Sequence, residues 1–223
     1  APSSGHGVTT VVMGNCGVGF APARPEQHDL MIRLMEGVED IPGAVMVAGV
    51  PVNWETFPEY LDVIEQRHAD IDFAAQLPHN PLRVYVMGER GANCEPPTDD
   101  DLAEMRRLTA EAIRAGALGV TTTRNIAHRF RDGRLVPTVT TEEQELLALA
   151  AGLHDAGDGV FEILGDDRTT GEEQVELLRA LASSSGRPIS ITLTQPGNGS
   201  DRWRVILDGI ARANDEGMAI KAQ

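Results

Sequence analysis

The chain has 223 residues, of which 41% are hydrophobic and 24% charged, an ordinary composition for a globular domain that buries one sizeable core. Its formal net charge of -15 disfavours nucleic acid as a partner, because phosphate backbones are bound by clustered Lys and Arg. No run approaches the roughly 18 consecutive apolar residues of a membrane span, so we expect no membrane or nucleic-acid partner and favour a small-molecule substrate.

Short apolar runs rich in Val, Ile and Thr alternate with helical patterns along the chain. Buried strands are predicted at 7–13, 71–77, 83–87, 118–122, 159–164, 188–193 and 218–222. Helices are predicted at 25–36, 57–67, 98–115, 141–155, 171–183 and 201–214. This alternation indicates an α/β fold with parallel strands, either an open sheet or a barrel, between which periodicity does not choose.

The segment 36–60 interrupts the alternation, since it is long for a connection and contains Trp54, Phe57 and Tyr60. A long loop at one end of a barrel commonly carries specificity. The simpler interpretation is that each aromatic side chain packs the loop onto the domain.

Only two cysteines occur, Cys16 and Cys94, too few for a disulfide scaffold, which predicts a reducing, cytoplasmic location. Cys16 follows a predicted strand, at the end where β/α barrels keep their active sites. A thiol there could be a metal ligand, a nucleophile or a small buried core residue, and spacing alone favours the core residue. Cys94 has no comparable strand before it.

Several runs, HGVTTVVMGNCG, MEGVEDIPG, NWETFPEYLD, MGERG and AGALG, resemble the N-acyl-D-amino-acid deacylase (D-aminoacylase) branch of the metal-dependent amidohydrolase superfamily. The resemblance covers nearly the whole chain. It implies a partial (β/α)8 TIM-type barrel, approximately strands two to seven, so that residues 1–223 form one incomplete domain. It also implies that Cys16 is a zinc ligand and that 7–13 is the second strand.

The same resemblance places other functional groups outside the chain. In that branch a His-x-His pair lies on the first strand, expected before Ala1, and the catalytic Asp lies after the eighth, expected beyond Gln223. The start has no initiator Met or signal peptide and the end stops in a strand pattern, so both ends are expected to be cut. We therefore expect no catalytic residue in this chain, an inactive fragment, and possible self-association through unpaired edges.

The resemblance also has a gap at the zinc site. In the family, a histidine ends the fifth strand and another ends the sixth, but here those places read GVFEILGDD, around Leu164, and PISITLTQP, around Thr192 to Thr194. Leu has no lone pair to donate to a metal. Glu162, Asp166 and Gln195 could act as oxygen ligands instead, although hydrogen-bonded or solvated loop roles are simpler for each.

Two candidate substrate-binding residues lie in TTTRNIAHRFRDGRLVP, after the strand that the resemblance makes the fourth. Related deacylases have a substrate-facing loop there, which singles out His128. Arg124 could bind a substrate carboxylate through two parallel hydrogen bonds, or be an ordinary surface arginine. No function is assigned to the other histidines, which are His6, His28, His68, His79 and His154.

Together these features predict a zinc-dependent hydrolase of C–N amide bonds, acting on N-acyl amino acids when complete. The alternative is a divergent, non-catalytic small-molecule-binding barrel of the same fold, which the missing histidines favour.

Overall fold

The computed structural model describes residues 2–195 and 199–223 of the chain. Its strands are β1 (Thr10–Met13), β2 (Asp72–Ala75), β3 (Leu77–Pro78), β4 (Gly119–Thr123), β5 (Val160–Leu164), β6 (Ile189–Thr192) and β7 (Ile220–Ala222). Its helices are α1 (Pro2–Gly5), α2 (His28–Glu39), α3 (Gly43–Gly49), α4 (Phe57–Glu65), α5 (His79–Met87), α6 (Glu89–Ala92), α7 (Asp99–Arg114), α8 (Glu143–Ala156), α9 (Gly171–Ser185) and α10 (Arg202–Asp215). Two 3-10 turns, η1 (Asn15–Gly17) and η2 (Pro25–Gln27), complete the elements.

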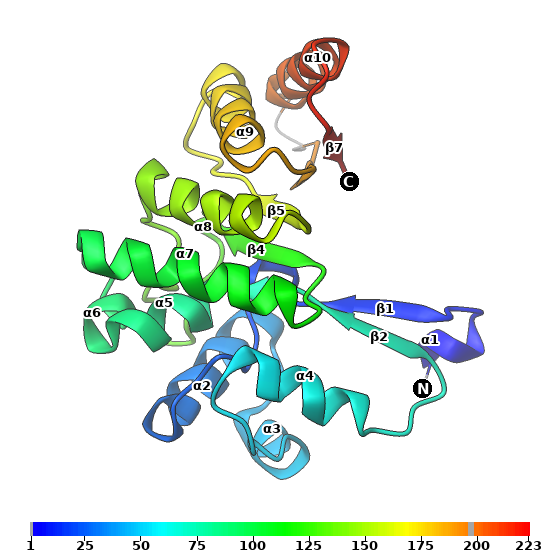
Figure 1. Ribbon diagram of the computed structural model, residues 1–223, viewed down its shortest axis with the longest axis vertical. Helices are drawn as coiled ribbons and strands as arrows, with labels where there is room; N and C mark the ends of the chain where they lie inside the picture. The colour runs from blue at the N-terminus through cyan, green and yellow to red at the C-terminus, as the bar shows by residue number, and fades with distance from the viewer. Residues whose placement is uncertain (1, 196–198) are drawn as a thin grey trace.

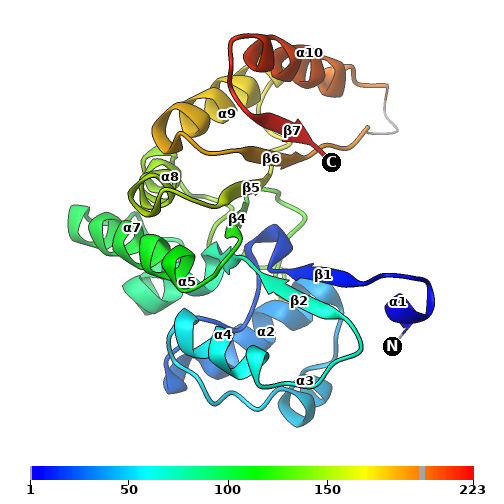
Figure 2. The same ribbon diagram turned by 45° about the vertical axis from the view of Figure 1, so that its right-hand side comes forward.

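The strands lie side by side in chain order, and every pair is parallel. β1 pairs with β2, and the second ladder runs β3-β4-β5-β6-β7. Only Gln76 separates β2 from β3, so the two ladders follow one another without a crossover. Figures 1 and 2 show the resulting curved row of strands, with α7, α8, α9 and α10 along one side. The predicted α/β class is confirmed, and within residues 2–195 and 199–223 the sheet does not close on itself.

The main core lies between the sheet and these helices. Phe161 and Ile163 of β5 are fully buried there against Leu149 of α8 and Leu178 of α9. Because successive strand residues point to opposite faces, the residue between them, Glu162, points to the other side of the sheet. The packing of the core thus decides which side chains are left for a polar site.

The predicted strand at 83–87 is wrong, because these residues belong to helix α5. Leu82, Val84 and Val86 alternate with polar or aromatic residues in the manner of a strand. The helix is buried nearly all round, from His79 to Val84, and so it shows no apolar stripe of helical period. Pro81 lies in its first turn, where no backbone N–H is required. The other six predicted strands and all six predicted helices are present with shifted ends.

The segment 36–60 contains the end of α2, helix α3 and the start of α4. Trp54 and Phe57 are buried, and the Trp54 indole donates a hydrogen bond to the Phe20 carbonyl over 2.9 Å. The ring centroids of Trp54 and Tyr60 lie 5.0 Å apart in an edge-on arrangement. These aromatic side chains therefore pack the segment onto the domain, as the simpler interpretation predicts.

Among the described helices, none combines the length and the apolar character that crossing a membrane requires.

Candidate functional site

The GNCG turn, residues 14–17, follows β1 and lies directly on β3 and β4. Gly14 and Gly17 have φ angles of 104° and 70°, which favour glycine. A Cβ at Gly17 would lie 2.8 Å from the Thr122 Cα, and one at Gly14 would lie 2.6 Å from the Gln76 carbonyl oxygen. Both glycines thus allow the close approach that places Cys16 over the sheet.

Side chains of the sheet and of α5 hold this turn in place. The Gly17 N–H donates to the Thr121 hydroxyl over 3.0 Å, and that hydroxyl donates to the Gly14 carbonyl. The Asn80 amide donates to the Gly17 carbonyl over 2.9 Å and accepts from the Thr138 N–H over 3.1 Å. The turn is therefore fixed at the carboxyl ends of the strands.

Cys16 is a half-buried, unpaired thiol within this turn. Burial, followed by the charges of Glu39 and Glu162, raises its pKa to about 11. Without a bound cation the side chain is therefore a neutral thiol near pH 7, a poor nucleophile. Cys94 is also unpaired and follows α6.

Glu162 of β5 lies below the turn, and 6% of its surface is exposed. One carboxylate oxygen accepts from the Gln76 amide over 2.6 Å, and the other accepts from the Gln223 amide over 3.0 Å. The Gln223 amide also donates to the Ser190 hydroxyl over 2.8 Å. We call the side of the sheet that carries Gln76, Thr121, Glu162, Ser190 and Gln223 the inner face.

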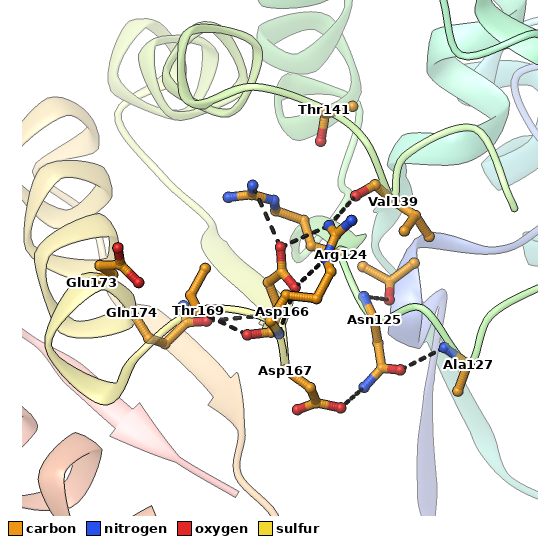
Figure 3. A network of polar contacts seen from close by, with 12 residues as sticks. Arg124, Asn125, Ala127, Val139, Thr141, Asp166, Asp167, Thr169, Glu173 and Gln174 are labelled. Carbon is orange, nitrogen blue, oxygen red and sulfur yellow. Dashed lines mark hydrogen bonds and ion pairs between the residues drawn. The ribbon is translucent and has the colours of Figure 1, made fainter. Parts of the chain in front are cut away.

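A second polar cluster surrounds Asp166, just after β5 (Figure 3). Arg168 donates two hydrogen bonds to the Asp166 carboxylate, each over 2.7 Å, and the Arg124 guanidinium lies 3.6 Å from it. Burial raises the pKa of Asp166, but the hydrogen bonds and charge of Arg168, together with the charge of Arg124, hold it below its ordinary value. Asp166 is thus an ionised partner of arginines.

Arg124, a predicted substrate-binding residue, immediately follows β4 and has a side chain that is 20% exposed. Its guanidinium contacts Asp166, but its Nε atom is buried and has no hydrogen-bond partner among the described residues. Figure 3 shows the neighbouring Asn125, whose amide donates to Asp167 over 2.7 Å. This cluster ties the end of β4 to the end of β5.

His128, the other predicted substrate-binding residue, lies in the same connection, residues 124–142. Its ring is half-buried, and burial lowers its pKa, which favours the neutral imidazole near pH 7. Its Nδ1 atom is buried without a hydrogen-bond partner in the part of the chain that the structure describes. Across that same part no hydrogen bond joins His128 to Arg124. The connection itself packs on α2 through Phe130 and Leu34.

A buried ionic network of His79, Arg83, Thr122 and Glu145 was not predicted from the sequence. His79 Nδ1 lies 2.8 Å from the Thr122 hydroxyl, and its Nε2 lies 2.9 Å from a Glu145 oxygen. Arg83 donates to the same Glu145 oxygen over 2.7 Å. The one available signal was a charged residue, Arg83, inside the apolar run LRVYVM. Its partner Glu145 lies 62 positions away, too far for a local pattern to pair the two residues. Thr122 points to the helix side of β4, so this network stabilises the fold behind the site.

The described residues do not fit a zinc site. No group of three or more His, Cys, Asp or Glu side chains is placed to hold a metal in the ranges 2–195 and 199–223. β5 and β6 end in Leu164 and Thr192, Asp166 is paired with Arg168, and Glu162 belongs to no such group among the described residues. Gln195 is exposed and completes no such group. Cys16 therefore has too few protein partners here for the three that catalytic zinc usually takes.

A sequence model of the amidohydrolase family matches residues 1–220. The chain belongs to the amidohydrolase family.

Two curated relatives come from Alcaligenes xylosoxydans xylosoxydans, a D-aminoacylase and an N-acyl-D-aspartate deacylase. Each is 34% identical to this amidohydrolase chain over 123 residues, which are 54% of the chain and 22% of the relative. An uncharacterized protein of Mycobacterium tuberculosis is 35% identical over 120 residues, 52% of the chain and 19% of that protein. The matched part thus spans about a fifth of the length of these relatives.

Two solved structures share the fold. An N-acyl-D-glutamate deacylase from Bordetella bronchiseptica, complexed with zinc and a phosphonate inhibitor, superposes with a TM-score of 0.73 at 23% identity, covering 99% of this chain and 42% of that one. A D-aminoacylase superposes with a TM-score of 0.70 at 22% identity, covering 100% of this chain and 42% of that one. The curated relatives confirm the predicted resemblance to the D-aminoacylase branch, and the solved structures show that the fold is shared.

Proposed function

We propose that the complete protein hydrolyses C–N amide bonds and that its substrates are N-acyl amino acids. The match of the amidohydrolase family along residues 1–220 carries this proposal. The names of the relatives, deacylases of N-acyl-D-amino acids, support the substrate class. The chain spans less than half of the solved deacylases, so the activity is proposed for the complete protein. The two unpaired cysteines are consistent with a cytoplasmic location, which belongs to the same proposal.

We also propose that β1 to β7 form strands two to seven of a (β/α)8 barrel, with residues 1–223 as one incomplete domain. The unbroken parallel order of the strands supports this, with β2 and β3 counted as one strand. The carboxyl ends of barrel strands carry the active site, which is where the GNCG turn, Arg124 and Asp166 lie.

Zinc enters the proposal by resemblance, with Cys16 as its one candidate ligand. Bound zinc would polarise the amide carbonyl and acidify a water molecule. Because the described residues do not complete a zinc site, we assign no step of the reaction to the metal. Metal content measured by mass spectrometry on the complete protein tests this part. Zinc that is stoichiometric in the wild type and lost in Cys16→Ala would establish Cys16 as a ligand. Zinc content that is the same in the wild type and in Cys16→Ala would show that Cys16 is not a ligand.

Arg124 and His128 are proposed to bind the substrate. The buried Arg124 Nε without a partner can donate to a carboxylate, and an unmet buried donor costs about 1–3 kcal/mol. The neutral His128 ring can accept or donate one hydrogen bond at Nδ1. We expect Arg124→Lys to raise KM about tenfold, because Lys lacks the forked geometry. Arg212→Lys, on the exposed surface of α10, is the matched control and should leave KM unchanged.

The alternative function is a non-catalytic small-molecule-binding barrel, favoured by Leu164 and Thr192 at the ends of β5 and β6. Amine release from a panel of N-acetyl-D- and N-acetyl-L-amino acids, with calorimetric binding of the same compounds, separates the two functions. Amine release supports the hydrolase. Binding without amine release supports the alternative.

A further inference from the structure

Glu162 differs from every other buried carboxylate in the described part of the chain. Buried carboxylates there are Asp101, Glu145, Glu162 and Asp166. Three of them have an arginine partner: Asp101 pairs with Arg90, Glu145 with Arg83 and Asp166 with Arg168. Glu162 accepts hydrogen bonds from neutral amides only.

A buried carboxylate without a cation is costly, because amide donors satisfy its hydrogen bonds but leave its charge uncompensated. Lys221 lies on the same face of β7, opposite Ser190 in the register, but its side chain is exposed and forms no ion pair with Glu162 within the described ranges. The charge of Glu39 also acts on the nearby Cys16, so the neighbourhood is negative. The inner face therefore has a place for positive charge that the described residues do not fill.

A polar group without a hydrogen-bond partner among the described residues lies on the same face. Thr192 is two residues beyond Ser190 on β6, so its side chain points to the inner face, and its register partner is Leu164. The Thr192 hydroxyl is buried and has no hydrogen-bond partner among the residues described. Because Glu162 pairs with Ser190 in the same register, the Glu162 carboxylate and the Thr192 hydroxyl lie on neighbouring strands. Thr192 is nearer the carboxyl ends of these strands.

We propose that the inner face binds a cationic nitrogen of the ligand, with Glu162 as its counter-ion and the Thr192 hydroxyl as an added hydrogen-bonding group. Each Glu162 oxygen has further acceptor capacity beside the amide that it already accepts from. This inference rests on the proposed function, and it makes N-acyl amino acids with a basic side chain the preferred substrates. Glu162 and Thr192 are then specificity-determining residues.

The test uses the complete protein and compares Nα-acetyl-lysine with Nα-acetyl-norleucine, whose side chain has the same four carbons but no amino group. Both compounds are tested as D and L forms. For the wild type we expect kcat/KM to favour the lysine compound by at least about tenfold, as expected for a desolvated charge pair. The preference should vanish in Glu162→Gln, which keeps the shape and one acceptor. Glu176→Gln, on the exposed surface of α9, should retain it.

Thr192→Val separates recognition from folding. Its hydroxyl has no partner to lose, so the midpoint of urea unfolding should not fall, whereas KM for the lysine compound should rise. Equal kcat/KM for the two compounds in the wild type, or a preference that survives Glu162→Gln, would overturn the inference while leaving the hydrolase intact. If neither compound releases free amino acid, the proposed function fails. The inference is then tested by calorimetry: tighter binding of the lysine compound than of the norleucine compound, lost in Glu162→Gln, would support it, and equal Kd values would overturn it.

Discussion

Glu145 shows at the residue scale how one buried charge organises the fold behind the site. It accepts from both His79 and Arg83, and all three side chains are nearly inaccessible. Glu145→Gln leaves the Arg83 charge buried without its carboxylate, so we expect a loss of about 3–5 kcal/mol in the free energy of unfolding. Urea unfolding measures this loss. Glu104→Gln, at an exposed ion pair with Arg107, is the control and should cost about 1 kcal/mol or less.

The same carboxylate makes a pH-dependent contribution to stability. Burial raises the pKa of Glu145, but the hydrogen bonds and charges of His79 and Arg83 outweigh it and hold the pKa below the ordinary value of 4.5. The contribution is therefore present above pH 4.5 and lost as pH falls through the lowered pKa. The difference in unfolding free energy between wild type and Glu145→Gln should shrink as pH is lowered from 5 to 3. A difference that is constant over this range would contradict the assignment.

Several polar contacts of the site join residues that lie far apart in the sequence, and these contacts could not be predicted. The position of Cys16 at the end of a strand follows from the run GVTTVVMGNCG and is confirmed. The amides that hold Glu162 come from positions 76 and 223, and neither local spacing nor resemblance pairs them. The partners of Glu145 are equally distant. Long-range polar pairs follow from the strand register, which hydrophobic pattern alone does not specify between parallel strands.

At the scale of elements, the connection 124–142 is held against α2 by a glycine. A Cβ at Gly37 would lie 2.3 Å from the Arg129 carbonyl oxygen and 2.7 Å from the Phe130 Cα, whereas nothing lies within 4 Å of one at Gly49 in α3. Gly37→Ala should therefore destabilise the protein by about 1–3 kcal/mol through overpacking against backbone. Gly49→Ala should be neutral or stabilise by about 0.4–1 kcal/mol. Thermal unfolding of the two variants measures both effects, and equal shifts would show that α2 and the connection do not pack as described.

Elements whose residues alternate between a buried and a polar environment were predictable. α7 is capped by Thr98, whose hydroxyl accepts from the Asp101 N–H, and such caps mark helix starts in the sequence. The failure at α5 has the opposite cause, since nearly all its residues are buried. Burial on all sides removes the periodic signal that distinguishes helix from strand.

At the scale of the whole molecule, the described sheet has two outer strands, β1 and β7, each paired on one side only. Unpaired edges of this kind can pair with other chains, and self-association through them is a proposal that light scattering of the chain 1–223 would test. The fold class and family were predictable because alternating strands and helices, together with several specific runs, extend along the whole chain. The uncompensated charge of Glu162 on the inner face could not be predicted, because it depends on which residues the neighbouring strands place around this carboxylate.

The central claim is that the complete protein cleaves the C–N bond of an N-acyl amino acid by adding water. Incubation of the purified protein with N-acetyl amino acids in water enriched in oxygen-18, followed by mass spectrometry of the acid that is released, tests it most directly. The account predicts acetate carrying one heavy oxygen, together with an equal amount of free amino acid. Recovery of the intact N-acetyl compounds under conditions where they bind would contradict it.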